Sequence, residues 1–134
     1  MGDLKGFVCK NVTVNQLLCS TCNSLKSLVG MPEHCEELIC INCEYLTDFT
    51  GISTDVEYLD CTYCTSLKSF IGIGNKCKSV VADGCKKLID FKDLPESVEK
   101  LQINHIKPEV AAEYIGRPIE INGKPMNLIS NARR

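Results

Sequence analysis

The nine residues LICINCEYL, from Leu38 to Leu46, contain a Cys-x-x-Cys motif that recurs in the stretches before and after it. LLCSTCNSL spans Leu17 to Leu25, and LDCTYCTSL spans Leu59 to Leu67. Between Cys22 and Cys40 lie 17 residues, a gap typical of four-cysteine zinc sites. These thiols could therefore bind a metal, form disulfides, carry out redox chemistry or pack in a core. The pattern of the surrounding sequence distinguishes these alternatives.

The motif belongs to a repeat of 21 residues. One apolar column is formed by Leu17, Leu38, Leu59, Val80 and Leu101. The others are Cys19, Cys40, Cys61, Ala82 and Ile103; Cys22, Cys43, Cys64, Cys85 and Ile106; Leu25, Leu46, Leu67 and Leu88; Leu28, Phe49, Phe70 and Phe91; Met31, Ile52, Ile73 and Leu94; and Cys35, Val56, Cys77 and Val98. Seven columns keep register over four units with no insertion, which chance does not produce.

The spacing within a unit predicts a short strand followed by a tight return. Leu17 and Cys19 point to the same side because strand side chains alternate with period two. Leu25, Leu28 and Met31 are three residues apart, which suits an irregular or 3-10-like return path. A single coil cannot enclose its own core, so the coils must stack and bury one another.

The unit L-x-C-x-x-C-x-x-L resembles the leucine-rich repeat, and the resemblance covers roughly Leu4 to Ile106. Its length is similar to that of the short repeats of bacterial effector proteins, and its cysteine content to that of repeats from large DNA viruses. Cysteine replaces leucine at the third position, and one extra residue precedes the next leucine. The resemblance implies an α/β-type repeat solenoid with a five-stranded parallel sheet, whose concave strand face binds partners.

The expected organisation is one solenoid followed by a cap. Residues 1–106 form the solenoid, with a partial coil at 1–16, repeats at 17–37, 38–58, 59–79 and 80–100, and a last strand at 101–106. Residues 107–134 form a C-terminal cap and tail, with a helix in KPEVAAEYIG between Pro108 and Gly116 and a hairpin at Asn122–Gly123. The partial N-terminal coil leaves core exposed, which predicts a weak homodimer through that end.

The periodicity favours packing for the thiols. The two Cys-x-x-Cys columns also accept Ala82, Ile103 and Ile106, which cannot bind metal, and a thiolate cluster in an apolar core would lack charge compensation. Redox catalysis requires an exposed, acidified thiol, whereas these columns point inward. The geometry permits disulfides, but the sequence lacks an apolar export signal, so we expect reduced thiols in the cytoplasm, or in the host cytoplasm if the protein is viral. Buried cysteine behaves as a small hydrophobe, and the second cysteine of each pair can bond to backbone groups.

The outward strand positions are the expected binding site for a protein partner. The candidate residues are Leu18, Ile39, Ile41, Tyr58, Asp60, Tyr63, Val81, Asp83, Lys100 and Gln102. Parallel strands bring them side by side, and a connected apolar patch on a monomer often has a use. Its acidic members suggest a partner that carries Lys or Arg.

The remaining features exclude other functions. The net charge of −2 offers no field for nucleic acid or an acidic membrane, and no run of 18 apolar residues could span a bilayer. No catalytic constellation, metal site or cofactor motif is apparent, so we expect a non-catalytic interaction module. Two alternatives stay open: a self-associating structural scaffold or particle component, and a substrate-recruiting module of a ubiquitin-ligase assembly.

Overall fold

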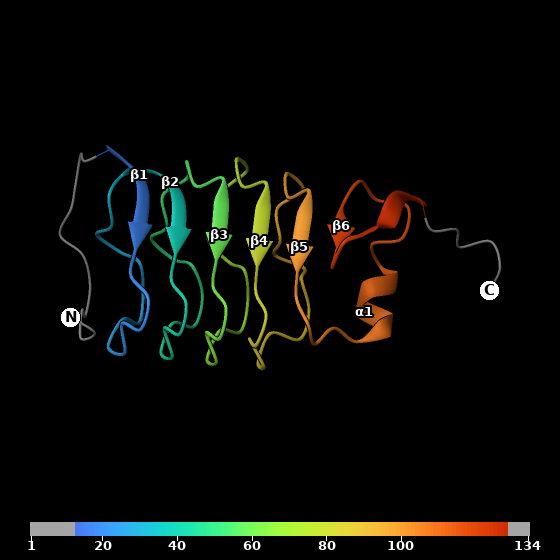
Figure 1. Ribbon diagram of the computed structural model, residues 1–134, viewed down its shortest axis with the longest axis horizontal. Helices are drawn as coiled ribbons and strands as arrows, with labels where there is room; N and C mark the ends of the chain where they lie inside the picture. The colour runs from blue at the N-terminus through green and yellow to red at the C-terminus, as the bar shows by residue number, and fades with distance from the viewer. Residues whose placement is uncertain (1–12, 129–134) are drawn as a thin grey trace.

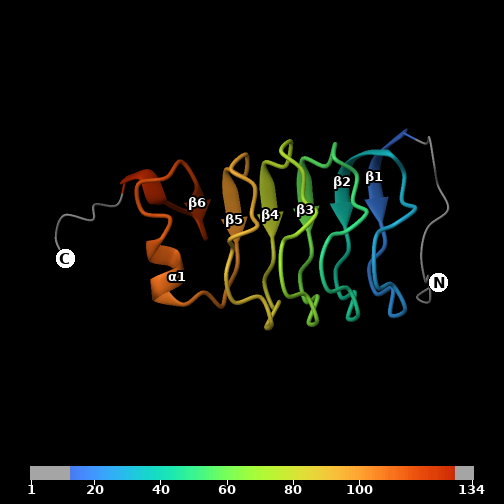
Figure 2. The same cartoon turned by 180° about the vertical axis from the view of Figure 1, so that it is seen from behind.

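The protein is a β-solenoid, seen in a computed structural model that describes residues 13–128 (Figure 1). The repeat strands are β1 (Thr13–Leu18), β2 (His34–Ile39), β3 (Tyr58–Asp60), β4 (Ser79–Val81) and β5 (Lys100–Gln102). Each pairs in parallel with the next, and the paired residues are 21 apart, as in Leu38↔Leu59. The strands lie side by side along the molecule, and the return segments run behind them (Figure 2).

The sheet contains seven strands, so the expectation of five was too low. The additional strands are β6 (Glu120–Ile121) and β7 (Lys124–Pro125), which form the hairpin around Asn122–Gly123. β6 pairs in parallel with β5, so the hairpin continues the sheet as a sixth rung. The register Leu101↔Ile121 is 20 residues rather than 21, because the last return path runs through a different segment. Both hairpin residues have positive φ, 52° for Asn122 and 81° for Gly123, as the tight turn requires.

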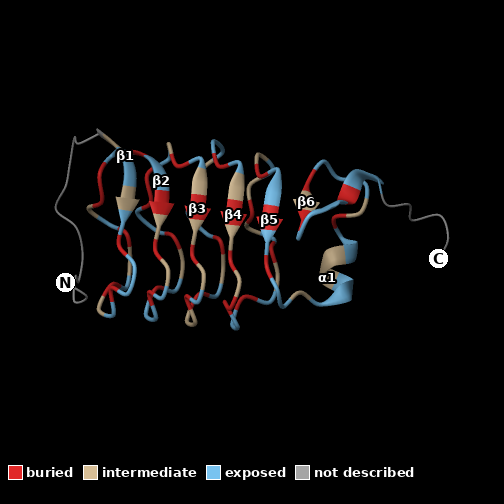
Figure 3. Cartoon of the chain, in the orientation of Figure 1, coloured by how far each residue is buried: buried red, intermediate tan, exposed pale blue. Residues whose placement is uncertain are grey.

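The repeat columns form one continuous core. Within residues 13–128, every residue of the seven repeat columns is buried except Leu17 and Ile106. These two lie at the two ends of the repeat and are partly exposed. The buried residue recurs at the same height in β2, β3, β4 and β5 (Figure 3). Each coil thus removes apolar side chains from water only because its neighbours cover them, as expected for a solenoid.

The return path is a series of three-residue turns, as the spacing predicts. Leu46 N–H donates to the Cys43 carbonyl, Ile52 N–H to the Phe49 carbonyl, and the same bonds recur one repeat later. Glycine is required where the coils approach most closely: at Gly72, which has a φ of 109°, a Cβ atom would lie 2.3 Å from the Phe49 carbonyl oxygen. The side chains at the three-residue spacing therefore all turn inward.

The expected C-terminal helix is shorter than KPEVAAEYIG suggests. Helix α1 covers Pro108–Ala112, begins with the proline in its first turn, and contains no buried residue. The next residues form turns up to Gly116, which has a φ of 90°, and the 3-10 helix η1 (Met126–Leu128) follows β7. The C-terminal segment contributes Tyr114, Ile119, Ile121 and Met126 to the core. The Tyr114 ring lies 5.9 Å from that of Phe91 and extends the aromatic column of Phe49, Phe70 and Phe91.

Candidate functional site

Three rows of side chains run across the sheet on the side opposite the core. The sheet pairing places Gln16, Glu37, Tyr58, Ser79, Lys100 and Glu120 in one row, and Leu18, Ile39, Asp60, Val81 and Gln102 in the next. Backbone bonds beyond the strand ends align Ile41, Thr62 and Asp83 in a third. Nine of the ten candidate residues stand in these rows. We call this surface, formed by the outward residues of the three rows, the strand face.

Most apolar candidates are half-buried rather than free. Ile39, Ile41, Tyr58 and Val81 are partly exposed, whereas Leu18, on the first described strand, is 65% exposed. Burial, and then the nearby carboxylates of Asp60 and Glu37, raise the pKa of Tyr58. The apolar members therefore pack against their neighbours and keep part of their surface exposed.

The candidate site is extended, not a single cluster. Leu18 lies on the first described strand and Gln102 on the fifth, four strand spacings away. With about 4.8 Å between strands, that separation is roughly 19 Å. A ligand that contacts all ten residues must itself be extended or be a folded protein surface.

The two aspartates of the site are held differently. Asp60 Oδ1 accepts bonds from the N–H and hydroxyl of Thr62, at 3.1 and 2.6 Å. Asp83 Oδ2 accepts a bond of 2.6 Å from the Gln102 amide, whereas its Oδ1 is buried and has no hydrogen-bond partner among residues 13–128. A buried oxygen without a donor is costly, so Asp83 has an unused acceptor.

Tyr63 lies outside the three rows, at the turn that follows β3. Its φ of 60° is in the left-handed region, and the same position in the neighbouring coils is filled by Thr21, Asn42 and Gly84, also with positive φ. The Tyr63 ring rests on Gly84, where a Cβ atom would lie 2.2 Å from Cδ1. Glycine in the next coil thus makes room for the ring, which remains 53% exposed beside the strand face.

The sequence analysis did not identify a row of interacting polar side chains, His34, Asp55 and Lys76, near the start of the strands. His34 Nδ1 lies 2.6 Å from Asp55 Oδ2, and Lys76 Nζ donates to Asp55 Oδ1 at 2.8 Å. Lys76, and then His34, lower the pKa of Asp55, and Asp55 in turn raises the pKa of Lys76. The three residues are spaced by the repeat, so the 21-residue period could have revealed them. All three line a shallow groove of about 440 Å³.

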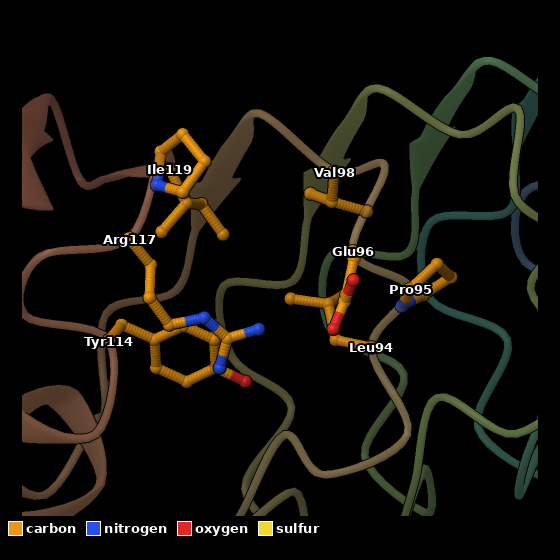
Figure 4. Close-up of a pocket in the computed structure, with 8 residues that line it drawn as sticks. Leu94, Pro95, Glu96, Val98, Tyr114, Arg117 and Ile119 are labelled. Atoms are coloured by element: carbon orange, nitrogen blue, oxygen red, sulfur yellow. The ribbon is translucent and has the colours of Figure 1, made fainter. Parts of the chain in front are cut away.

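The sequence analysis also did not identify a small pocket near the C-terminal end. Its volume is about 240 Å³, and it lies between the last return segment and the turn after α1 (Figure 4). Arg117 lies over the Tyr114 ring, with Cζ 4.6 Å from the ring centroid, and Glu96 stands across the opening. Arg117 and Tyr114 therefore contact each other at one wall of the pocket.

The thiols of the repeat bond to the backbone of the preceding coil. Cys43, Cys64 and Cys85 each donate to the carbonyl of Cys19, Cys40 and Cys61 respectively, all at 3.1 Å. The nine cysteines among residues 13–128 are buried and free, and within that range no three His, Cys, Asp or Glu side chains come together to hold a metal. Burial raises the pKa of Cys77 to about 11 and also raises that of Cys35. Raised values favour the protonated thiol, the form that packs.

Comparison with protein-family models, curated proteins and solved structures finds no match for this chain. Among the described helices, none combines the length and apolar content that a membrane crossing would need. The expected homodimer contact involves residues 1–12, which lie outside the described range, and stays a prediction.

Proposed function

We propose that the protein is a non-catalytic interaction module of the leucine-rich-repeat type, which binds a protein partner on the strand face. The observation that carries this proposal is the alignment of Leu18, Ile39 and Val81 in one row of the sheet, with Ile41 and Tyr58 in the rows beside it. The core does not require these outward side chains to be apolar. Contiguous apolar residues on an accessible surface favour a binding role over a chance distribution.

Binding is favoured over catalysis by what the polar side chains do. The closest contact between titratable side chains, His34 with Asp55, belongs to an exposed ladder that Lys76 completes. The thiols are engaged with backbone carbonyls inside the core. On this proposal the residues after β5 cap the solenoid, with Tyr114 covering the last coil.

A peptide selection from an unbiased random display library tests the proposal. Binders selected on the wild-type protein are compared on a strand-face variant, Leu18→Ser with Ile39→Ser and Val81→Thr. The matched control is Val29→Ser with Ile71→Ser and Ile89→Thr, which changes exposed apolar residues of the return segments. Circular dichroism establishes that both variants fold.

We expect most selected binders to lose at least tenfold in affinity for the strand-face variant and to keep their affinity for the control. Binders that are insensitive to the strand-face changes, or equally sensitive to both sets, would refute a binding role for this face.

A further inference from the structure

The centre of the strand face carries an uncompensated negative charge. Between Lys26 and Lys68 the sequence contains no Lys or Arg. The same stretch has eight acidic residues, Glu33, Glu36, Glu37, Glu44, Asp48, Asp55, Glu57 and Asp60. The third and fourth coils and the C-terminal segment contain most of the cations, so the molecule is polarised along its length.

Among residues 13–128, the acids nearest the apolar row have no counter-ion. The ion pairs among residues 13–128 join Asp55 to Lys76 and Glu99 to Lys78, and the His34 ring also contacts Asp55. Glu37 accepts only the neutral amide of Gln16 at 3.0 Å, and Asp60 accepts only the neutral groups of Thr62. The charge of these two carboxylates is therefore not neutralised within residues 13–128.

The acids and the apolar side chains alternate across the strands. Ile39 stands beside Asp60, which stands beside Val81, and Glu37 stands beside Tyr58 in the adjacent row. Asp83 follows in the third row, where its Oδ2 accepts the Gln102 amide and its Oδ1 is buried beneath the surface. A partner must therefore present apolar groups and hydrogen-bond donors of positive charge at a spacing of a few ångströms.

Besides the apolar side chains and the carboxylates, the exposed Tyr63 ring is a third group that could contact a cationic partner. Its position against Gly84 fixes one face of the ring, and the backbone N–H of Tyr63 bonds to the Asp83 carbonyl at 2.8 Å. An exposed aromatic ring with one face free suits a guanidinium group, which stacks on the ring.

We propose that the strand face over β2–β4 binds a protein segment in which apolar residues alternate with arginine or lysine. This inference rests on the proposed function and specifies its partner. The apolar side chains of the segment lie on Ile39, Ile41 and Val81. Its cations lie between Glu37, Asp60 and Asp83, with an arginine stacked on Tyr63.

The test uses three end-blocked, fluorescein-labelled nonapeptides in which Ile and Val alternate with Arg, with Gln or with Glu. Fluorescence anisotropy measures their binding to the full chain at low and moderate salt. The variant Asp60→Asn with Asp83→Asn removes two charges from the strand face and keeps the shape of both side chains. The control Glu44→Gln with Asp48→Asn removes the same charge from the segment after β2.

We expect the Arg peptide to bind at least tenfold more tightly than the Gln peptide, and the Glu peptide to bind least. The strand-face variant should lose fivefold or more for the Arg peptide, and the control less than twofold. Added salt should weaken Arg-peptide binding to the wild-type protein, because the contacts are partly exposed ion pairs.

Equal losses in the two variants would mean general charge attraction and would overturn the inference, as would failure of the Arg peptide to bind. Equal affinity for the Arg and Gln peptides would also overturn it. Library-selected binders that depend on the strand face but carry no cation would reject the basic partner and leave the binding function intact, which separates the two failures.

Discussion

At the scale of single residues, the cysteines act as core side chains that also donate a hydrogen bond. Cys64 is fully buried and donates to the Cys40 carbonyl, an acceptor that the preceding coil would otherwise leave to weaker contacts. The donor column shows where this bond is dispensable, since Ile106 stands one repeat after Cys85 and has no thiol to donate. A thiol is thus tolerated at these positions because it is small, apolar and able to satisfy backbone.

Stability should fall at alkaline pH because of the buried thiols. The pKa of Cys77 is about 11 in the folded protein, against an ordinary value of 9.0. Below pH 9 the Cys77 thiol is protonated in both the folded and the unfolded protein. Between pH 9 and about 11 it stays protonated only in the folded protein, so the free energy of unfolding decreases as pH rises. Cys77→Val, the residue that Val56 and Val98 supply in this column, should fold and remove about 2 kcal/mol of that decrease.

Urea unfolding of wild type and Cys77→Val at pH 8 and pH 10.5 measures the difference. Lysine and tyrosine ionisation affects both proteins alike and cancels. If the free energy of unfolding falls equally in the wild type and in Cys77→Val between the two pH values, Cys77 is not buried as the neutral thiol.

Truncation of a core leucine should be severe. Leu67 is fully buried, so Leu67→Ala should lower the free energy of unfolding by about 2–5 kcal/mol through lost burial and the cavity left behind. Lys68→Ala, on the exposed neighbouring residue, is the control and should change it by less than about 0.5 kcal/mol. Chemical denaturation provides both values, and a harmless Leu67→Ala would show that the column is misassigned.

At the scale of elements, the repeat strands and turns could be predicted from the sequence, but the structure of the segment after β5 could be predicted only in part. Strand position and return path follow from the two-residue and three-residue spacings of Leu17, Cys19, Leu25 and Leu28. The joining of β6 to the sheet could not be predicted, because two-residue strands carry no periodic signal. The left-handed backbone at Tyr63 is signalled only by Asn42 and Gly84, one repeat before and after it, and the contact of its ring with Gly84 has no signature in the residue types.

The C-terminal segment should be held mainly by Tyr114. Its ring continues the aromatic column, and its hydroxyl donates to the Phe91 carbonyl at 3.1 Å. We expect Tyr114→Ala to cost about 3–5 kcal/mol, as large aromatic truncations do, and Tyr114→Phe to cost about 1 kcal/mol for the hydrogen bond alone. Urea unfolding distinguishes the two variants, and equal small effects would mean that this segment does not cover the last coil.

At the scale of the whole molecule, the candidate site is a consequence of the stacking. The sheet brings Leu18 and Gln102, which are distant in sequence, into one row, and the 21-residue period specifies which residues share it. Position in the rows was therefore predictable for nine of the ten candidates. The buried Asp83 Oδ1 was not, because it depends on side-chain packing: the Gln102 amide donates to the other oxygen of Asp83, and the Asn104 amide oxygen accepts from the Gly84 N–H.

The central claim is that a fixed 21-residue spacing, rather than any particular coil, determines how the columns stack. Deletion of residues 38–58 removes one full period and places Cys64 where Cys43 donates to the Cys19 carbonyl. The matched deletion of residues 38–57 removes one residue fewer, so the columns after the junction are one residue out of register with those before it. We predict cooperative urea unfolding, at reduced stability, for the 21-residue deletion and loss of the folded state for the 20-residue deletion. Equal behaviour of the two chains would contradict the account.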